Sequence, residues 1–424
     1  MRRPPTRFLL YSHDTFGLGH FRRTSSIAAA IVAADPTAQV LIATGSPVAG
    51  SFGLPERVDV LTLPSATKSD EGRYRPRKVT DGLDHLVRLR SAVLVAACTE
   101  FAPHAVLVDH APVGMAGELI PLLRSCTTRP PWSRPRLVLG LREIIDEADR
   151  TDAAWAADHS WSWLPAYDEI LVYGDGRLVT TADELRLGQR LGSPVRHVGF
   201  VAPPMPPARP GRVLDGRPYV LVTTGGGADG DGIVERHLDA VEAGALDGLA
   251  SLVVTGPLMA GDRRRELAAR AQRLPDVTTI EFTDDLRGLI ASATVVVSMA
   301  GYNTVAEELA AGVPALLVPR TAPRLEQDLR ARRLAPHGAL ERCTLEELSP
   351  DRIGDVVQRW AAGSVGRVLP AVDLGGAGRA ARLLVEAVDH AAADVTARTP
   401  AHATRPDASV PTRCATEQKE AVGV

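Results

Sequence analysis

The chain has 424 residues, of which 45% are apolar, so it exceeds one ordinary core and is expected to form two domains. Its formal net charge is −3 and only 4% of its residues are aromatic, which argues against a nucleic-acid-binding surface. The cysteines lack metal-site spacing, and no apolar run reaches the length of a signal-peptide core or a membrane span. We therefore expect a cytoplasmic protein that binds neither a metal nor a cofactor.

Short apolar runs alternate with amphipathic stretches through the first half of the chain. The predicted strands are RFLLYS, QVLIAT, VDVLTLP, AVLVDH, RLVLGL and EILVYG, and stretches such as RRTSSIAAAIVAA predict helices between them. Continuous apolar strands separated by helices indicate a parallel sheet covered on both faces. We therefore predict an α/β fold whose first domain, residues 1–200, is doubly wound and Rossmann-like.

A glycine-containing turn, SHDTFGLGHFRRTSS, follows the first predicted strand. Gly17 and Gly19 allow a tight turn, but Arg22 stands where a dinucleotide fingerprint needs its third glycine. One interpretation is a plain strand-to-helix turn with His20 near the helix N-cap. The other is a catalytic site, in which His20 takes a proton from an incoming hydroxyl and Asp14 orients its imidazole.

Closely spaced prolines interrupt the pattern in GFVAPPMPPARPGRVLDGRP and exclude a helix or a central strand. Residues 201–217 are therefore predicted to be an interdomain linker. The alternation resumes with YVLVTT, LVVTG, TTIEF, TVVVS and ALLVP, which predicts a second Rossmann-like domain over residues 218–392. Its last helix is expected from about Gly375 to His390, and residues 393–424 are expected to be disordered. Two such domains place a ligand cleft between the carboxyl ends of their sheets.

A second glycine turn lies in YVLVTTGGGADGDGIV. Gly225, Gly227 and Gly230 satisfy GxGxxG, but the next strand ends in LVVTGP, without the acid that a dinucleotide's ribose requires. Asp229 and Asp231 form a nominal DxD motif, which could hold a metal with a nucleotide diphosphate. Because Asp231 also suits the N-cap of the following helix, and three-residue matches often arise by chance, we favour the cap.

A third turn lies in TVVVSMAGYNTVAEELAAGVPALLVP, residues 294–319. Residues 301–304 begin a helix, so their backbone N–H groups and the helix dipole suit a phosphate or diphosphate. Thr304 and Glu307 also have the spacing of a capping box, which would give Glu307 a purely structural role. The turn alone leaves both roles open.

The stretch EFTDDLRGLIASATVVVSMAGYNTVAEELAAGVPALLVPRTAPRLEQDLRARRL, residues 281–334, resembles the nucleotide-sugar-binding half of GT-B glycosyltransferases. It is most similar to the family 28-like group that includes the peptidoglycan N-acetylglucosaminyltransferase making lipid II. The glycine turns GLGH and TTGGG also lie where this family has glycine loops, so the resemblance extends over most of residues 7–390. It implies two Rossmann-like domains facing a cleft.

The resemblance also implies roles for individual residues. The donor nucleotide sugar would be bound by Gly226, Gly227, Phe282, Thr283, Gly301, Asn303, Thr304, Glu307, Glu326 and Gln327. The base would lie at Phe282 and Thr283, the diphosphate at residues 301–304, and the ribose hydroxyls at Glu307. Glu326 stands where the lipid II enzyme has glutamine, which points to a different sugar. The acceptor would be bound by Gly17, Gly19, Asp109 and His110, with His20 as the catalytic base and Asp14 beside it.

The expected activity is inverting, metal-independent transfer of a sugar from a nucleotide sugar, UDP-linked by analogy, to an acceptor hydroxyl or amine. Helix N-terminal amides and Arg320 would stabilise the leaving diphosphate. The basic segment KSDEGRYRPRK, residues 68–78, is either a solvated loop or a contact for an anionic acceptor or lipid. No apolar face accompanies it, so a soluble small-molecule acceptor is favoured over a membrane-bound one.

Two other functions fit the same pattern. A nucleotide-sugar epimerase, similar to UDP-GlcNAc 2-epimerase, would use Glu326 beside the sugar and would need no acceptor. A non-catalytic nucleotide-sugar sensor would keep the turn at residues 294–312 and would tolerate loss of His20.

Overall fold

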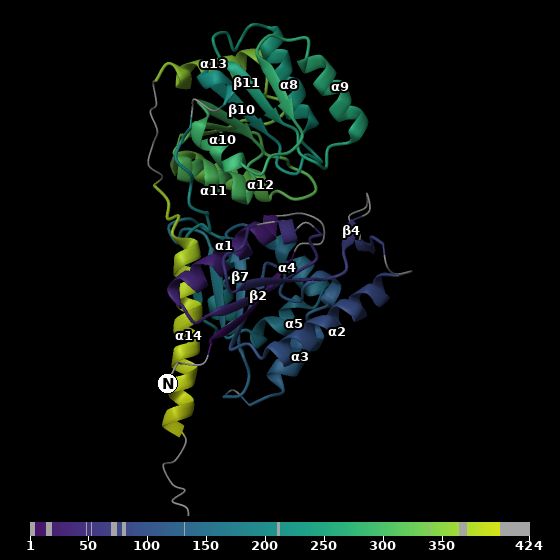
Figure 1. The fold of residues 1–424 in the computed structure, drawn as a ribbon, viewed down its shortest axis with the longest axis vertical. Helices are drawn as coiled ribbons and strands as arrows, with labels where there is room; N and C mark the ends of the chain where they lie inside the picture. The colour runs from purple at the N-terminus through teal and green to yellow at the C-terminus, as the bar shows by residue number, and fades with distance from the viewer. Residues whose placement is uncertain are drawn as a thin grey trace, which may run out of the picture.

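The structure is a computed structural model that describes most of the chain in two lobes. The described residues are 5–13, 19–47, 49–51, 53–68, 74–78, 82–130, 132–209, 213–337, 339–363 and 371–398. Figure 1 shows the lobes stacked end to end, with a long C-terminal helix running beside the lower one. None of the helices in these ranges is long and apolar enough to cross a membrane.

The first lobe contains a seven-stranded parallel sheet in the order β3-β2-β1-β6-β7-β8-β9. Its strands are β1 Arg7–Ser12, β2 Gln39–Thr44, β3 Val58–Thr62, β6 Ala105–Asp109, β7 Arg136–Arg142, β8 Glu169–Tyr173 and β9 Val195–His197. β1 lies between β2 and β6, with Leu9 opposite Leu41 on one side and Val106 on the other. The six strands predicted in this half are confirmed.

Helices cover this sheet on both sides. They are α1 Gly19–Ala34, α2 Leu83–Phe101, α3 Ile120–Thr127, α4 Ala148–Ala157, α5 Ser160–Trp163, α6 Thr181–Glu184 and α7 Leu187–Leu191. The segment that was predicted as a basic loop is partly a small antiparallel hairpin, in which β4 Ala66–Lys68 pairs with β5 Tyr74–Pro76.

The second lobe contains a six-stranded parallel sheet in the order β12-β11-β10-β13-β14-β15. Its strands are β10 Tyr219–Thr223, β11 Ala250–Val254, β12 Val277–Ile280, β13 Val295–Ser298, β14 Ala315–Leu317 and β15 Leu340–Arg342. Its helices are α8 Asp231–Glu242, α9 Gly261–Ala271, α10 Leu286–Ser292, α11 Tyr302–Ala311, α12 Glu326–Leu334 and α13 Pro350–Ala361. Every residue of β10, β11 and β13 is buried, which explains why these strands are continuous apolar runs.

An apolar core runs without interruption from one lobe into the other. Phe200, at the end of the first lobe, stacks near Tyr302 of α11, with ring centroids 5.7 Å apart. The Tyr302 hydroxyl accepts a hydrogen bond of 2.9 Å from the backbone N–H of Val201. The segment 202–209 that follows has neither helix nor strand, as its prolines predicted.

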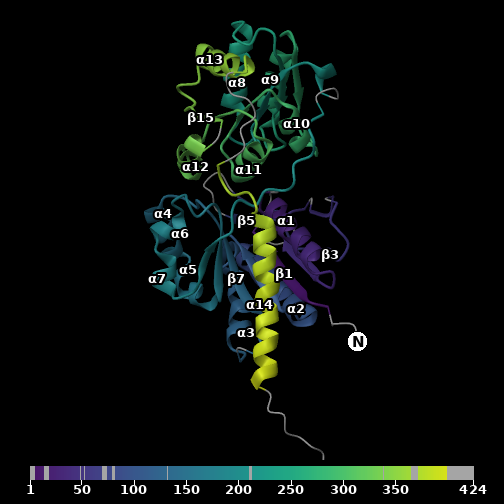
Figure 2. The ribbon, with the colours of Figure 1, turned by 90° about the vertical axis from the view of Figure 1, so that its left-hand side faces the viewer.

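The last helix, α14 Gly376–Arg398, differs from its prediction in both length and position. It continues past His390, and it packs along α1 of the first lobe instead of joining the second domain (Figures 1 and 2). The helix is held at its start by Arg379, which donates to the carbonyl of Val198 at 2.6 Å. Its buried side chains include Ala380, Leu384 and Val388, an i, i+4, i+8 stripe that matches the apolar surface of the first lobe.

Candidate active site

Side chains of the two lobes meet where the carboxyl ends of both sheets face each other. Asn303 of α11 donates to the carbonyl of Gly19 in α1 at 2.9 Å, and Leu325 donates its N–H to Asp146 at 3.0 Å. Arg142, the last residue of β7, pairs with Glu326 of α12 at 3.0 Å. Parallel α/β sheets bind ligands at this edge, so these contacts mark the candidate site.

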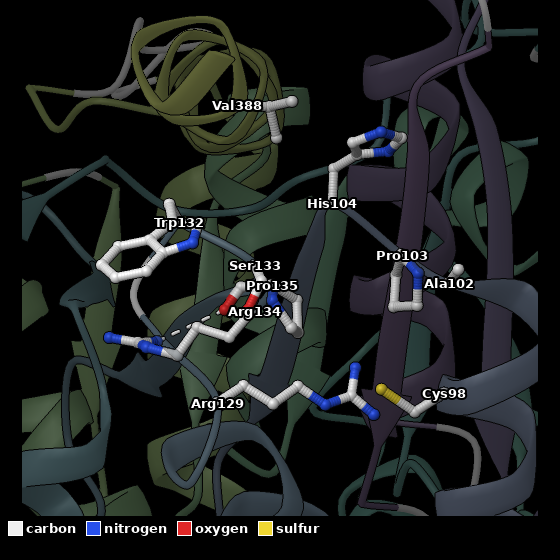
Figure 3. Close-up of a pocket in the computed structure, with 10 residues that line it drawn as sticks. All are labelled: Cys98, Ala102, Pro103, His104, Arg129, Trp132, Ser133, Arg134, Pro135 and Val388. Atoms are coloured by element: carbon white, nitrogen blue, oxygen red, sulfur yellow. Dashed lines mark hydrogen bonds between the residues drawn. The ribbon is translucent and has the colours of Figure 1, made fainter. Parts of the chain in front are cut away.

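A pocket of about 420 Å³ lies elsewhere, on the first lobe beside α14 (Figure 3). Its lining residues are Cys98, Ala102, Pro103, His104, Arg129, Trp132, Ser133, Arg134, Pro135 and Val388. None of the residues predicted to bind donor or acceptor belongs to this set. We therefore place the candidate site at the meeting of the two lobes and not in this pocket.

His20 and Asp109 form a hydrogen-bonded pair in the first lobe. His20 is the second residue of α1 and Asp109 is the last residue of β6, and the His20 Nδ1 lies 2.6 Å from the Asp109 Oδ2. Arg23 also binds Asp109, through Nε at 2.9 Å and Nη2 at 2.7 Å. Burial favours protonation of Asp109, but Arg23 and the His20 hydrogen bond outweigh it and hold the pKa of Asp109 well below its usual range.

This charged Asp109 determines which nitrogen of His20 carries the proton. Because a carboxylate only accepts hydrogen bonds, we assign the proton to Nδ1, which leaves Nε2 as the basic atom. The Arg23 Nη2 also lies 2.9 Å from Nδ1, but two donors cannot bond each other, so its hydrogen points to Asp109. The sequence assigned the partner role to Asp14, which lies outside the described residues together with Gly17. The structure gives that position to Asp109.

Three histidines gather around this pair. The ring centroids of His13, His20 and His110 are 5.1 to 5.9 Å apart. His110, which follows β6 with a φ of 72°, is 8% exposed, and burial together with nearby Arg142 lowers its pKa well below the usual value. It is therefore neutral, and its Nδ1 has no hydrogen-bond partner among the described residues. His110 lies beside His20, where the sequence predicted acceptor binding.

The capping box that the spacing of Thr304 and Glu307 left open at α11 does not form. The helix begins at Tyr302 with Gly301 as its N-cap, so Thr304 is already inside the helix and cannot cap it. Glu307 is instead fully buried, and its Oε1 contacts Nη2 of Arg22 from the first lobe. Its Oε2 is buried without a hydrogen-bond partner in the part of the chain that the structure describes.

Burial is the main influence on Glu307 and raises its pKa, while the positive charges of Arg22 and Arg287 act in the opposite direction. A buried carboxylate with an unused oxygen is costly unless a donor reaches it. The hydroxyls of a ribose are suitable donors. Glu307 is therefore not a helix cap, and its unused oxygen leaves room for a hydrogen bond from a ligand.

The triple-glycine turn packs against the loop that follows β11. Gly227 has a φ of 91°, and a Cβ on this residue would lie 2.3 Å from the carbonyl oxygen of Thr255. Gly226 accepts a hydrogen bond from the N–H of Leu258 at 2.8 Å. A side chain at position 227 is thus excluded by space.

The two aspartates of the nominal DxD motif bind different arginines. Asp229 pairs with Arg320 at 2.6 Å, and Asp231 lies 3.2 Å from Nε of Arg263. The predicted N-cap is wrong, because α8 begins at Asp231 and its cap is Gly230. The described residues include no group of three or more His, Cys, Asp and Glu that could hold a metal ion.

Phe282 and Thr283 follow β12 at the same edge of the second sheet. The Phe282 side chain is 56% exposed, which is unusual for a large apolar residue and leaves its ring free to stack on a base. The Thr283 hydroxyl accepts the N–H of Asp285 at 3.0 Å, which fixes the turn into α10.

Glu326, in the first turn of α12, is buried and surrounded by cations. Burial favours its neutral form, but Arg142, Arg330 and Arg320 outweigh this and lower its pKa to about 2. It pairs with Arg142 at 3.0 Å and Arg320 at 3.3 Å. Gln327 accepts the backbone N–H of Arg320 at 3.1 Å, so both predicted sugar-binding residues are held in place.

A second ion pair runs beside the first in the opposite sense. Glu143, next to Arg142, binds Arg330, which lies one turn after Glu326, at 2.5 Å. Arg330 is fully buried and also donates to the carbonyl of Ala300 at 3.0 Å. Sequence reasoning missed Arg142, Glu143 and Arg330, because nothing in their local spacing reveals partners that lie in the other lobe.

The chain is similar to known proteins both in the sequence of its second lobe and in its fold. Residues 220–364 match the family model described as glycosyltransferase family 28 C-terminal domain. The fold superposes on the glycotransferase of kitacinnamycin with a TM-score of 0.56 and 17% identity, over 94% of this chain and 99% of that protein. Over 92% of the chain it superposes on all of TcCGT1, solved in complex with UDP, with a TM-score of 0.62 and 15% identity. The chain has the GT-B glycosyltransferase fold.

The chain also has relatives by sequence. It is 32% identical over 170 residues to the UDP-N-acetylglucosamine–N-acetylmuramyl-(pentapeptide) pyrophosphoryl-undecaprenol N-acetylglucosamine transferase of Corynebacterium efficiens, covering 39% of this chain and 44% of that protein. The enzyme of the same name from Cronobacter sakazakii is 33% identical over 171 residues, covering 40% of this chain and 46% of that one. The match thus spans about half the length of these relatives.

Proposed function

We propose that this protein is an inverting, metal-independent glycosyltransferase that moves a sugar from a UDP-linked donor to an acceptor hydroxyl or amine. The observation that carries the proposal is the position of the His20–Asp109 pair. It faces the N-terminus of α11 across the meeting of the lobes, where Asn303 already touches Gly19, the residue before His20.

The proposed base is Nε2 of His20. Asp109 remains ionised and accepts the Nδ1 proton, so it stabilises the imidazolium that forms when Nε2 takes a proton from the acceptor. The acceptor oxygen or nitrogen then attacks the anomeric carbon while the bond from that carbon to the diphosphate breaks. Attack opposite the leaving group inverts the anomeric centre.

The donor is assigned to the second lobe. The ribose hydroxyls donate to Glu307, and the diphosphate lies at the N–H groups of residues 301–304, where the helix dipole opposes its charge. Arg320 adds a cation on the same side and is 30% exposed despite its pairs with Asp229 and Glu326. These groups supply the electrostatic stabilisation of the leaving diphosphate.

The acceptor is assigned to the first lobe, beside His110, and we favour a soluble small molecule. The names of the relatives include an undecaprenol-linked acceptor, but the match covers only 44% and 46% of their lengths, so their acceptor is not transferred to this chain. An epimerase is less well supported, because the lowered pKa and ion pairs of Glu326 make it a poor proton donor.

The proposal is tested by incubating the protein with UDP-, GDP- and dTDP-sugars, each with soluble alcohols and amines or a polyprenyl diphosphate sugar. Mass spectrometry then identifies any transferred sugar, and a UDP-release assay gives the rate. The proposal is supported if the wild-type protein transfers sugar from a UDP-sugar and the Asp109→Asn variant does so much more slowly. Conversion of a UDP-sugar to its epimer without an acceptor, or binding without any turnover, contradicts it.

A further inference from the structure

The first turn of α1 already touches the residues assigned to the donor. Asn303, assigned to the diphosphate, donates to the carbonyl of Gly19 at 2.9 Å. Glu307, assigned to the ribose, is contacted by Nη2 of Arg22. Groups of the acceptor lobe therefore contact two side chains that the proposed function assigns to the donor.

The contact between Arg22 and Glu307 is asymmetric. The Glu307 side chain is 1% exposed, whereas that of Arg22 is 28% exposed and approaches from the surface of the first lobe. One oxygen of the carboxylate is engaged by Arg22, and the other is buried without a partner in the described chain. A buried carboxylate that uses one of its oxygens is suited to a ligand that brings two donors.

The sequence analysis gave Arg22 no role and noted only that it stands where a dinucleotide fingerprint needs its third glycine. The structure shows why a cation belongs there. Burial alone raises the pKa of Glu307, and the Arg22 charge counteracts this, so Arg22 favours the ionised form of the carboxylate. Arg287 also lowers the pKa of Glu307, but its guanidinium is held by the carbonyl of Pro204 at 2.8 Å.

We propose that Arg22 is an internal occupant of the ribose site, a positioning residue that is displaced from Glu307 when the donor binds. This inference rests on the proposed function, because it takes Glu307 as the ribose-binding group. The two ribose hydroxyls replace one guanidinium contact and also reach the unused oxygen. Arg22 is freed on the same helical turn as His20, so donor binding is transmitted to the acceptor lobe.

The displacement has a measurable cost. The apparent affinity for a nucleotide is reduced by the fraction of molecules in which Glu307 is already occupied. If the Arg22 contact is formed in about 70 to 90% of unliganded molecules, its removal tightens nucleotide binding about threefold to tenfold. A purely structural role for Arg22 predicts the opposite, because a disturbed site binds its ligand more weakly.

The test compares Arg22→Ala, Arg22→Gln and Arg22→Lys with the wild-type protein, using isothermal titration calorimetry with UDP, and with GDP in parallel because it carries the same ribose. Arg22→Ala and Arg22→Gln are expected to bind UDP about threefold to tenfold more tightly, with no rise in the melting temperature of the unliganded protein. Arg22→Lys restores a cation and should return toward the wild-type affinity. The matched control is Arg287→Ala, which removes a charge near Glu307 without breaking the contact and should not tighten binding.

Glu307→Gln separates failure of this inference from failure of the proposed function. If wild-type protein binds UDP and Glu307→Gln weakens it, while Arg22→Ala and Arg22→Gln bind UDP with unchanged or lower affinity, the displacement is wrong and the donor site stands. If wild-type protein binds no nucleotide, or Glu307→Gln binds as well as wild type, the donor site itself is wrong and the inference fails with it.

Discussion

Replacing His20 with alanine is expected to slow sugar transfer strongly and to leave the fold and the affinity for UDP unchanged. The substitution removes the proposed base but not the charge balance beneath it, since Arg23 keeps both of its hydrogen bonds to Asp109, at 2.9 and 2.7 Å. The His20 side chain is also 21% exposed, so no large cavity forms. A lost general base lowers rates by about 10²- to 10⁴-fold, which corresponds to about 3 to 5 kcal/mol in the barrier.

The assay measures UDP release with the acceptor found in the substrate panel, over about pH 5 to 9, and UDP affinity by calorimetry. Transfer by His20→Ala should be slow throughout this pH range, because the proposed base is absent. His85→Ala, at an exposed position of α2, is the control and should behave as wild type. Wild-type turnover with an unchanged pH profile would refute the assignment and turn attention to Asp14. A collapse of UDP affinity would instead place His20 on the donor side.

The remaining predictions concern the second lobe. Glu307→Ala should weaken UDP binding about tenfold or more, because a charge-assisted contact is lost. It should lower the melting temperature little, because Glu307 does not cap the helix. A clear drop in melting temperature at constant affinity would contradict this. Transfer should persist in EDTA, because Asp229 and Asp231 pair with different arginines; loss of turnover that Mg²⁺ restores would indicate a metal held by both. Burial raises the pKa of Glu308 from 4.5 to about 8. Between pH 4.5 and 8 the folded protein therefore holds a proton on Glu308 that the unfolded chain has lost. The free energy of unfolding should fall by about 1.4 kcal/mol per pH unit over this range. Glu308→Gln should flatten this fall in urea unfolding midpoints, and an unchanged pH dependence would show that Glu308 is not its source.

The fold followed from the sequence because its signals are local. Buried parallel strands are continuous apolar runs such as residues 219–223 and 295–298, and the turn before α11 carries its glycine and its helix start within a few residues. The structure excludes the alternative role of Thr304 and Glu307 as a capping box. A four-residue pattern does not specify where the helix begins, and here it begins at Tyr302.

The contacts that build the site could not be predicted, because they depend on how distant segments meet. The partner of His20 is Asp109, which lies 89 residues away and which the resemblance placed at the acceptor without pairing it with His20. The pairing of Arg22 with Glu307 joins residues in different lobes. The packing of α14 on the first lobe likewise depends on its contact with α1. A division of the chain into two consecutive domains does not allow for the last helix to return to the first domain.

A crystal structure of the protein with UDP tests the central claim most directly. The account predicts that both ribose hydroxyls lie within hydrogen-bond distance of the Glu307 carboxylate and that the diphosphate lies at the backbone N–H groups of residues 301–304. It also predicts that Arg22 no longer contacts Glu307. UDP bound at the pocket beside Trp132, or held away from α11 with the Arg22 contact intact, would contradict the account.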